Sequence, residues 1–321
     1  MENILEIKNL NISFKLESQT AKAIHGVSLQ LKRAKSLGIV GESGCGKSVT
    51  AMSIMKLLPS NAMIESGEIL WKGKNIINYP EKDMLQIRGN KIALIPQDPM
   101  TSLNPLYTVG EQIHETIMLH QKVSKKEAKE IAIESLKSVK LPEADKSYND
   151  YPHQFSGGMR QRAIIAMALS CNPELIIADE PTTALDVTVQ AQILKLIKSI
   201  QEERGTSLLL ITHDLGIVAE TCDNVAVLYA GRIVEYTDTR SIFKNPLHPY
   251  TQGLMKSLPA KNSLRLKTIK GQPPAISDNV SGCPFNSRCD QKMEICENIS
   301  PELISVTENH KVSCLLHKKI M

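Results

Sequence analysis

The feature that most constrains this chain is GESGCGKS, Gly41 to Ser48, a glycine-rich segment between two apolar patterns. The run before it, KSLGIV, has the composition of a buried strand, and SVTAMSIMKLLP after it has helical spacing as far as Pro59. In this context the glycines turn backbone N–H groups toward an anion at the positive start of the helix. The segment therefore predicts a phosphate-binding loop.

The pattern Gly-x4-Gly-Lys-Ser also assigns roles to single positions. Lys47 is expected to reach the β- and γ-phosphates of a nucleotide, and Ser48 to ligate Mg²⁺. The other expected nucleotide-binding residues of the segment are Gly41, Ser43, Gly44, Cys45, Gly46 and Val49. Cys45 is read as a small residue that fits the loop, in preference to a redox-sensitive thiol at a helix start.

A second apolar run, LIIA at 175–178, ends in two acidic residues. Such a run predicts a buried strand with Asp179 at its carboxyl end, where a carboxylate can hold Mg²⁺. Glu180, the next residue, is placed to polarise a water molecule and is the expected catalytic base. Together with the glycine-rich loop, these acids predict ATP and Mg²⁺ as ligands.

Charge and hydropathy exclude several other functions. The net charge of +4 is too small to indicate nucleic-acid binding. No run approaches the roughly 20 apolar residues that span a bilayer, and MENILEIKNL at the N-terminus has no apolar signal-peptide core. We therefore expect a cytosolic chain that acts at a membrane only through partners.

The order of patterns predicts an α/β fold with a helical insertion. ILEIKNLNISFKL and AIHGVSLQL alternate with the period of strands, and NKIALIPQD, ELIIADE and SLLLITHD are further strand patterns. Helical patterns fill residues 106–170, so a helical subdomain is expected at about 100–165. Periodicity is lost near residue 260, which divides the chain into an expected nucleotide-binding domain, 1–260, and an extension, 261–321.

The segment FSGGMRQR, starting at Phe155, identifies the kind of nucleotide-binding protein. Ser-Gly-Gly before a helical pattern is a second anion-binding helix start, which a dimer needs if each chain completes its partner's site. The segment resembles the LSGGQ signature of ATP-binding-cassette (ABC) ATPases, with Phe155 and Met159 departing from it at the two ends. The resemblance implies a P-loop NTPase core with an antiparallel β-subdomain, and ATP hydrolysis.

The resemblance also implies roles for residues outside the glycine-rich loop. Gln97 in IPQDP is similar to the Q-loop glutamine, which binds Mg²⁺ and senses the γ-phosphate, and His213 in ITHD to the switch histidine. Ala184-Leu185-Asp186 is similar to the D-loop at the dimer interface, and Phe14 to the aromatic residue that stacks on adenine. The signature residues expected to complete the partner's ATP site are Ser156, Gly157 and Gly158.

The C-terminal sequence narrows the resemblance to ATPases of oligopeptide and dipeptide importers. NPLHPYTQGLMKSLP and GQPPAISDNVSGCPFNSRC are similar to their C-terminal extension. This implies a homologous second ATPase subunit (a heterodimer in preference to a homodimer), two membrane permease subunits, an extracytoplasmic peptide-binding protein and a position at the cytoplasmic face of the membrane. A nickel or metal-chelate importer is the first alternative, and a soluble ABC ATPase acting on nucleic acid a remote one.

Four of the seven cysteines gather in the tail, at Cys283, Cys289, Cys296 and Cys314. In a cytosolic protein such a cluster suggests metal before disulfide. Four thiolates can hold a [4Fe–4S] cluster or zinc. The tight cysteine pair usual for zinc is missing, which favours the cluster; zinc and reduced thiols without metal remain open.

Overall fold

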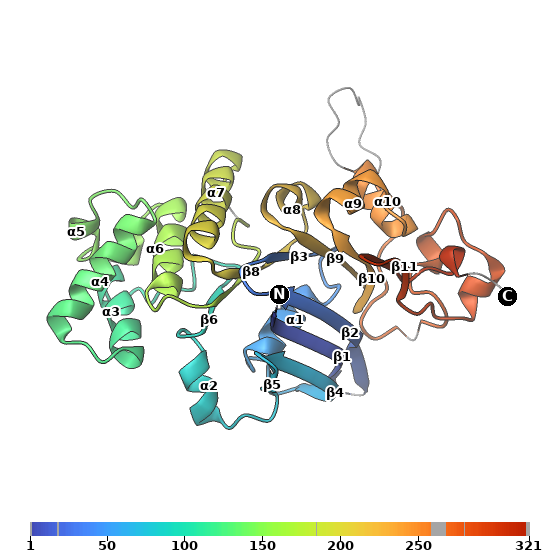
Figure 1. Cartoon of the computed structure of the whole chain (residues 1–321), viewed down its shortest axis with the longest axis horizontal. Coiled ribbons are helices and arrows are strands. Elements are labelled where there is room, and N and C mark those ends of the chain that lie inside the picture. The colour runs from blue at the N-terminus through green and yellow to red at the C-terminus, as the bar shows by residue number, and fades with distance from the viewer. Residues whose placement is uncertain (1, 18, 184, 258–267, 279, 319–321) are drawn as a thin grey trace. The chain divides into compact units, whose positions relative to one another are not determined.

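The computed structural model of the protein describes residues 2–17, 19–183, 185–257, 268–278 and 280–318. These residues form two compact units. The first contains the chain up to Lys32, Ser36–Ile77 and the chain from Ile211 onward, and the second contains Arg33–Lys35 and Asn78–Leu210. Most helices and strands of both units are labelled in Figure 1.

An antiparallel sheet forms one layer of the first unit. Its strands, in the order β2-β1-β4-β5, are β2 (Thr20–Lys32), β1 (Asn3–Lys15), β4 (Ala62–Trp71) and β5 (Lys74–Asn75). The alternating sequence pattern predicted β1 and β2 correctly, and Leu5, Ile7 and Ile12 of β1 are buried. Register shifts along β1 and its partners interrupt the strict alternation.

The second sheet of this unit carries the glycine-rich loop. The strand order is β11-β12-β10-β9-β3, with bounds β11 (Ile304–Thr307), β12 (His310–Val312), β10 (Arg232–Asp238), β9 (Asn224–Tyr229) and β3 (Ser36–Val40). β3 runs parallel to β9, and every residue of β3 is buried. The predicted β9–β10 hairpin forms, because Ala230 and Gly231 both take the positive φ angles that a tight hairpin turn requires.

The helices of the first unit are α1 (Lys47–Ile54), α8 (Leu215–Thr221), α9 (Thr239–Lys244) and α10 (Pro249–Lys256), followed by 3₁₀ turns at Asn286–Arg288, Glu294–Glu297 and Leu315–His317. The prediction that α1 ends at Pro59 was wrong. The helix ends at Ile54 because Lys56 turns into the left-handed region with a φ of 51°, and the Leu57 N–H donates back to the Met52 carbonyl.

The second unit contains the parallel strands β6 (Ile92–Ile95) and β7 (Leu175–Asp179), the helices α2 (Glu81–Ile87) and α7 (Val187–Arg204), and the start of β8 (Ser207–Thr212). β7 is buried along its whole length, as its apolar run predicted. β6 ends at Ile95, slightly before the end near Gln97 that the sequence pattern predicted.

The predicted helical block is present in the same unit as α3 (Val109–His120), α4 (Lys125–Ser138), α5 (Ala144–Ser147), a 3₁₀ turn (Pro152–Gln154) and α6 (Gly157–Leu169). Capping boxes fix the first two helix starts. Thr108 and Glu111 satisfy each other's backbone N–H groups at α3, and Ser124 and Glu127 do so at α4.

The α/β fold class is therefore confirmed, with the antiparallel sheet and the helical block that the sequence indicated. Within the described residues, no helix combines the length and apolar character needed to cross a bilayer. The domain boundary expected near residue 260 falls among residues 258–267, which lie outside the described part of the chain. That division stays a prediction.

Candidate nucleotide-binding site

The glycine-rich loop begins where β3 ends and closes at the start of α1. A Cβ atom on Gly41 would lie 2.2 Å from the Leu228 carbonyl oxygen, so only glycine fits this first position. Gly46, the residue before α1, has a φ of 105°, which glycine adopts without strain. These two positions give the loop the tight turn that its sequence pattern predicted.

Lys47 supplies the positive charge of the loop. Its side chain is buried, and the Nζ atom donates to the carbonyl oxygens of Gly41 (2.8 Å) and Glu42 (3.1 Å). In the described structure no side chain caps the start of α1. A helix start without a side-chain cap, beside a buried lysine, is the donor set that suits a polyphosphate.

Cys45 packs inside the loop. The side chain is 4% exposed, and burial raises the pKa of its thiol to about 11 despite the charge of Lys47 nearby. The thiol is therefore protonated at neutral pH. This favours the interpretation of Cys45 as a small residue that fits the loop over that of a reactive thiolate.

The other predicted nucleotide ligands of the first unit lie at strand ends. Phe14, near the end of β1, pairs with Ala21 and Ala62 of the neighbouring strands and is partly exposed. His213 directly follows β8 and is exposed. The Asp214 N–H donates to the Thr212 hydroxyl oxygen at 3.1 Å, which fixes the turn that presents His213.

The predicted catalytic acids are part of the second unit. Asp179 ends β7 and is 2% exposed. The Glu180 carboxylate oxygen Oε2 accepts hydrogen bonds from Gln97 Nε2 at 3.1 Å and from the Thr183 hydroxyl at 2.9 Å. The structure thus brings Gln97 and Glu180 together, although 83 positions separate them.

Glu180 has a φ of 46°, in the left-handed region that side chains other than glycine rarely occupy. Backbone strain of this kind persists only where the surrounding contacts hold it, and it is concentrated at functional sites. This conformation carries the chain away from β7 immediately after Asp179. Glu180 is therefore a strained residue whose carboxylate is held by two hydrogen bonds.

The Ser-Gly-Gly segment opens α6. Ser156 is the N-cap, and its hydroxyl accepts from the Met159 N–H at 3.3 Å. A Cβ on Gly158 would lie 2.9 Å from Val189 of α7, and the N-cap of α7 is Asp186. The predicted signature and D-loop residues are therefore neighbours.

Gly157 is the first residue of α6, and a Cβ added to it would make an ordinary contact, 3.5 Å, with Leu185. Ala184, the first D-loop residue, lies outside the described part of the chain. The packing reason for glycine is thus stronger at Gly158 than at Gly157.

Two contacts to the loop were missed by the sequence analysis. The Tyr250 hydroxyl accepts from the Glu42 N–H at 2.9 Å, and the Arg288 guanidinium pairs with the Glu42 carboxylate at 2.7 Å. Both residues lie more than 200 positions from the loop, and no local pattern links them to it. An acidic residue inside a phosphate-binding loop was the available signal, because it requires a nearby positive charge.

The tail cysteines are free thiols. Cys283, Cys296 and Cys314 are buried and Cys289 is half-buried; the Cys283 N–H donates to the Cys296 carbonyl at 2.8 Å. Burial raises the pKa of Cys283, Cys289 and Cys314, the last to about 11. No group of three or more His, Cys, Asp or Glu side chains able to hold a metal is present among the described residues, so the predicted cluster has no structural support.

Comparison with known proteins gives matches in both parts of the sequence. A family model described as ABC transporter matches residues 24–183. A second, described as oligopeptide/dipeptide transporter, C-terminal region, matches residues 234–296. The first match contains the glycine-rich loop and the signature, and the second contains Arg288 and three of the tail cysteines.

Similar proteins match over nearly the whole chain. The dipeptide transport ATP-binding protein DppD of Bacillus subtilis is 48% identical over 98% of this chain and 95% of its own length. The oligopeptide transport ATP-binding protein OppD of Salmonella typhimurium is 49% identical over 93% of this chain and 89% of its own. A dimeric structure of the ATP-binding cassette MJ0796 bound to ADP and Pi superposes with a TM-score of 0.66, at 29% identity, over 74% of this chain and 99% of that one.

Proposed function

Because this chain belongs to the ABC transporter family of ATPases, we propose that it is the ATP-hydrolysing subunit of a bacterial importer for oligopeptides or dipeptides. The observation that carries the proposal is the similarity to peptide-transport ATPases along nearly the full chain, tail included. Nickel or a metal chelate is the less favoured cargo, because the tail matches the family model of peptide transporters. Action on nucleic acid is not favoured, given the net charge of +4.

We propose that ATP binds along the glycine-rich loop and that Phe14 stacks on its adenine. Lys47 would leave the carbonyl oxygens it now contacts and donate to the phosphates. The backbone N–H groups of the loop would complete the cradle. The proposed binding residues of the loop are Gly41, Ser43, Gly44, Cys45, Gly46, Lys47, Ser48 and Val49.

The proposed Mg²⁺ ligands are Ser48, Gln97 and Asp179, whose hydroxyl, amide and carboxylate oxygens are donors that Mg²⁺ prefers. The ion, when bound, neutralises charge on the phosphates. Glu180 would orient and deprotonate the attacking water. Its hydrogen bonds from Gln97 and Thr183 fix the carboxylate for that purpose, and His213 would contact the γ-phosphate.

Two ATPase subunits are proposed to close around two ATP molecules. This chain would offer Ser156, Gly157, Gly158 and Asp186 to its partner's nucleotide, and the partner would offer the corresponding residues in return. The Ser156 hydroxyl already lies at a helix N-terminus, which favours an anion. We propose a heterodimer of homologous subunits at the cytoplasmic face of the membrane. Two permease subunits and an extracytoplasmic peptide-binding protein would complete the transporter.

The test of this function is peptide-dependent ATP hydrolysis by the assembled transporter. Glu180→Gln keeps the side-chain shape but removes the base, so we expect turnover to fall by about 100-fold or more while ATP binding persists. Thr183→Ala, which removes only one hydrogen bond to Glu180, is the milder control. Undiminished hydrolysis by a complex that carries Glu180→Gln and the same replacement at the corresponding glutamate of its partner would remove Glu180 from the catalytic role.

A [4Fe–4S] cluster on the tail cysteines, or zinc in its place, is a separate proposal that the described residues do not support. Metal binding would have to displace protons from thiols whose pKa values are raised. Elemental analysis of anaerobically purified protein decides it. Iron with sulfide identifies the cluster, one zinc per chain identifies the zinc site, and neither metal rules out both.

A further inference from the structure

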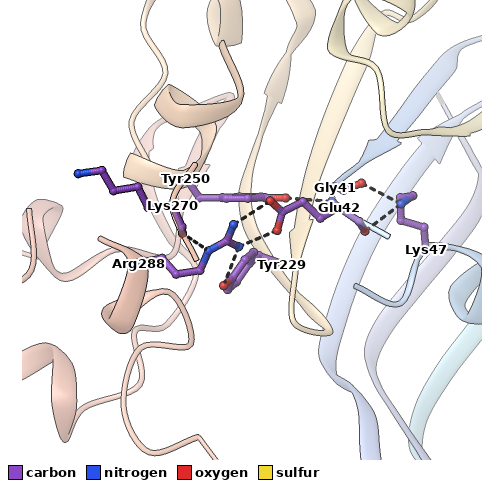
Figure 2. Close-up of polar contacts among 7 residues, drawn as sticks. All are labelled: Gly41, Glu42, Lys47, Tyr229, Tyr250, Lys270 and Arg288. Carbon is purple, nitrogen blue, oxygen red and sulfur yellow. Dashed lines mark hydrogen bonds and ion pairs between the residues drawn. The ribbon is translucent and has the colours of Figure 1, made fainter. Parts of the chain in front are cut away.

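The C-terminal segment contacts the phosphate-binding loop through a side-chain pair to which none of the proposed roles applies. Glu42 is the first variable residue of the loop. Its Oε2 atom accepts from Arg288 Nη1 at 2.7 Å and its Oε1 atom from Nη2 at 3.0 Å (Figure 2). Two parallel, charge-assisted hydrogen bonds fix direction as well as distance. The tail therefore holds one loop residue in a defined orientation.

Arg288 is itself held in place by the tail and by β9. The side chain is 4% exposed, and Nε donates to the Lys270 carbonyl at 2.9 Å. Nη1 also contacts the Tyr229 hydroxyl at 3.3 Å, and the guanidinium lies 5.7 Å from the Tyr229 ring and 5.9 Å from that of Phe285. The hydrogen bonds to Glu42 raise the pKa of Arg288 above its ordinary value, so it stays charged.

The backbone of Glu42 is hydrogen-bonded through both its N–H and its carbonyl group. The N–H donates to the Tyr250 hydroxyl at 2.9 Å, and the carbonyl accepts from Lys47 at 3.1 Å (Figure 2). Tyr250 is fully buried on α10, with its ring centroid 4.6 Å from that of Tyr229 and 5.4 Å from that of Phe285. Of the three described side chains that bind Glu42, two, Arg288 and Tyr250, thus come from outside the loop.

These anchors differ in what happens to them when ATP binds. Lys47 contacts the carbonyls of Gly41 and Glu42, and both contacts are lost if its ammonium turns to the phosphates. The contacts of Arg288 and Tyr250 do not involve Lys47, so they persist and keep the loop in shape. Arg288 also neutralises a carboxylate that would otherwise repel the phosphates.

We propose that Arg288 is a positioning residue for nucleotide binding. From the tail it fixes Glu42, and through Glu42 the shape and charge of the loop, so ATP affinity depends on the tail being folded against the loop. This inference rests on the proposed ATP-binding function. It assigns to the C-terminal segment a role in shaping the ATP site.

The test is equilibrium binding of a fluorescent ATP analogue, with Mg²⁺, to the full-length chain. Arg288→Ala should weaken binding about 10-fold, the scale of one lost charge-assisted contact. Arg288→Lys should restore little of it, because an ammonium cannot make the two parallel bonds. In a Glu42→Gln background, Arg288→Ala should cost less than about 2-fold, since the two residues act as one pair.

The matched control is Lys292→Ala, which removes another tail cation that pairs with Glu297, and it should bind ATP like the wild type. Melting curves test whether each variant is folded. If Arg288→Ala does not fold, the double-mutant cycle is measured with Arg288→Lys and Glu42→Gln instead. Unchanged affinity, or an equal loss in both Glu42 backgrounds, overturns the inference. Failure of the wild type to bind the analogue would instead overturn the proposed function.

Discussion

The phosphate-binding loop and the C-terminal segment lie in one unit and contact each other, yet their structures arise in different ways. The loop is predictable from its own residues, because only glycine fits where Gly41 approaches the Leu228 carbonyl oxygen and where Gly46 takes a positive φ. Among its described residues, the tail contains two short strands and three 3₁₀ turns, and contacts with distant residues hold it. A local sequence pattern therefore predicts the loop, although distant residues also hold it, whereas the fold of the tail depends on contacts with the rest of the unit.

Glu235 is the clearest anchor of the tail. This β10 residue has no exposed surface, and Oε1 lies 2.7 Å from His310 Nε2 of β12. Its carboxylate also accepts from the N–H groups of Leu247 and His248, both at 2.8 Å. One buried carboxylate thus joins three segments of the first unit.

Replacement of Lys47 should have the largest effect and should act on the loop alone. Lys47→Ala removes the charge expected to meet the phosphates, so ATP affinity should fall by about 100-fold or more. The resistance of the tail to protease should not change. Lys74→Ala, at an exposed lysine of β5, is the control for charge, and loss of the tail fold in the Lys47 variant would show that the tail depends on Lys47.

Glu235→Ala should act in the opposite way. It leaves buried donors without an acceptor, so the free energy of unfolding should fall by about 3 kcal/mol or more. Protease should then cleave the tail first, and ATP binding should weaken only about as much as in Arg288→Ala. Glu302→Ala, at an exposed tail residue, should leave stability and proteolysis unchanged. Equal protease sensitivity of the two variants would argue against the anchor.

A smaller effect is expected from His248, which is 1% exposed and accepts from the Tyr250 N–H through Nδ1 at 3.0 Å. Burial, with a smaller contribution from His317, lowers the pKa of His248 to about 3. Below about pH 6.5 the imidazole binds a proton in the unfolded chain but not in the folded chain. The free energy of unfolding therefore decreases as the pH is lowered from about 6.5 toward 3, by up to about 1.4 kcal/mol per pH unit.

Denaturant midpoints at pH 7 and pH 5 measure this slope. His248→Gln should reduce the slope by the amount that corresponds to nearly one bound proton. His153→Gln, at an exposed histidine of the other unit, should leave the slope unchanged. A slope that is the same in the wild type and the His248 variant would show that the imidazole is charged in the folded chain.

How far the sequence predicts the structure differs in the same way between the two regions. Strand β3, the loop, the start of α1 and strand β7 were predicted, because apolar runs and glycine spacing are local signals. The end of α1 was misplaced because Lys56, and not a proline, turns the chain. The pairing of Arg288 with Glu42, 246 positions apart, has no local pattern at all.

The predicted site shows the same limit. Sequence motifs named Gln97 and Glu180, but only the structure shows that they share a hydrogen bond and that Glu180 is strained. The cysteine count suggested a metal cluster, but thiol burial and protonation depend on side chains packed around them. Counts of residue types do not specify these surroundings.

The pairing of β12 with β10 has a consequence for synthesis of the chain. Strand β10 joins β12 through Glu235 and Tyr236, and the four-residue β11 pairs with β12 on its other side. The ribosome makes β12 some 70 residues after β10. Strand β10 is therefore an unpaired sheet edge until the tail has been translated. Open edges recruit strands from other chains. Messages truncated before His310 should therefore yield aggregating polypeptides, which makes the tail a self-shielding element of the nascent protein.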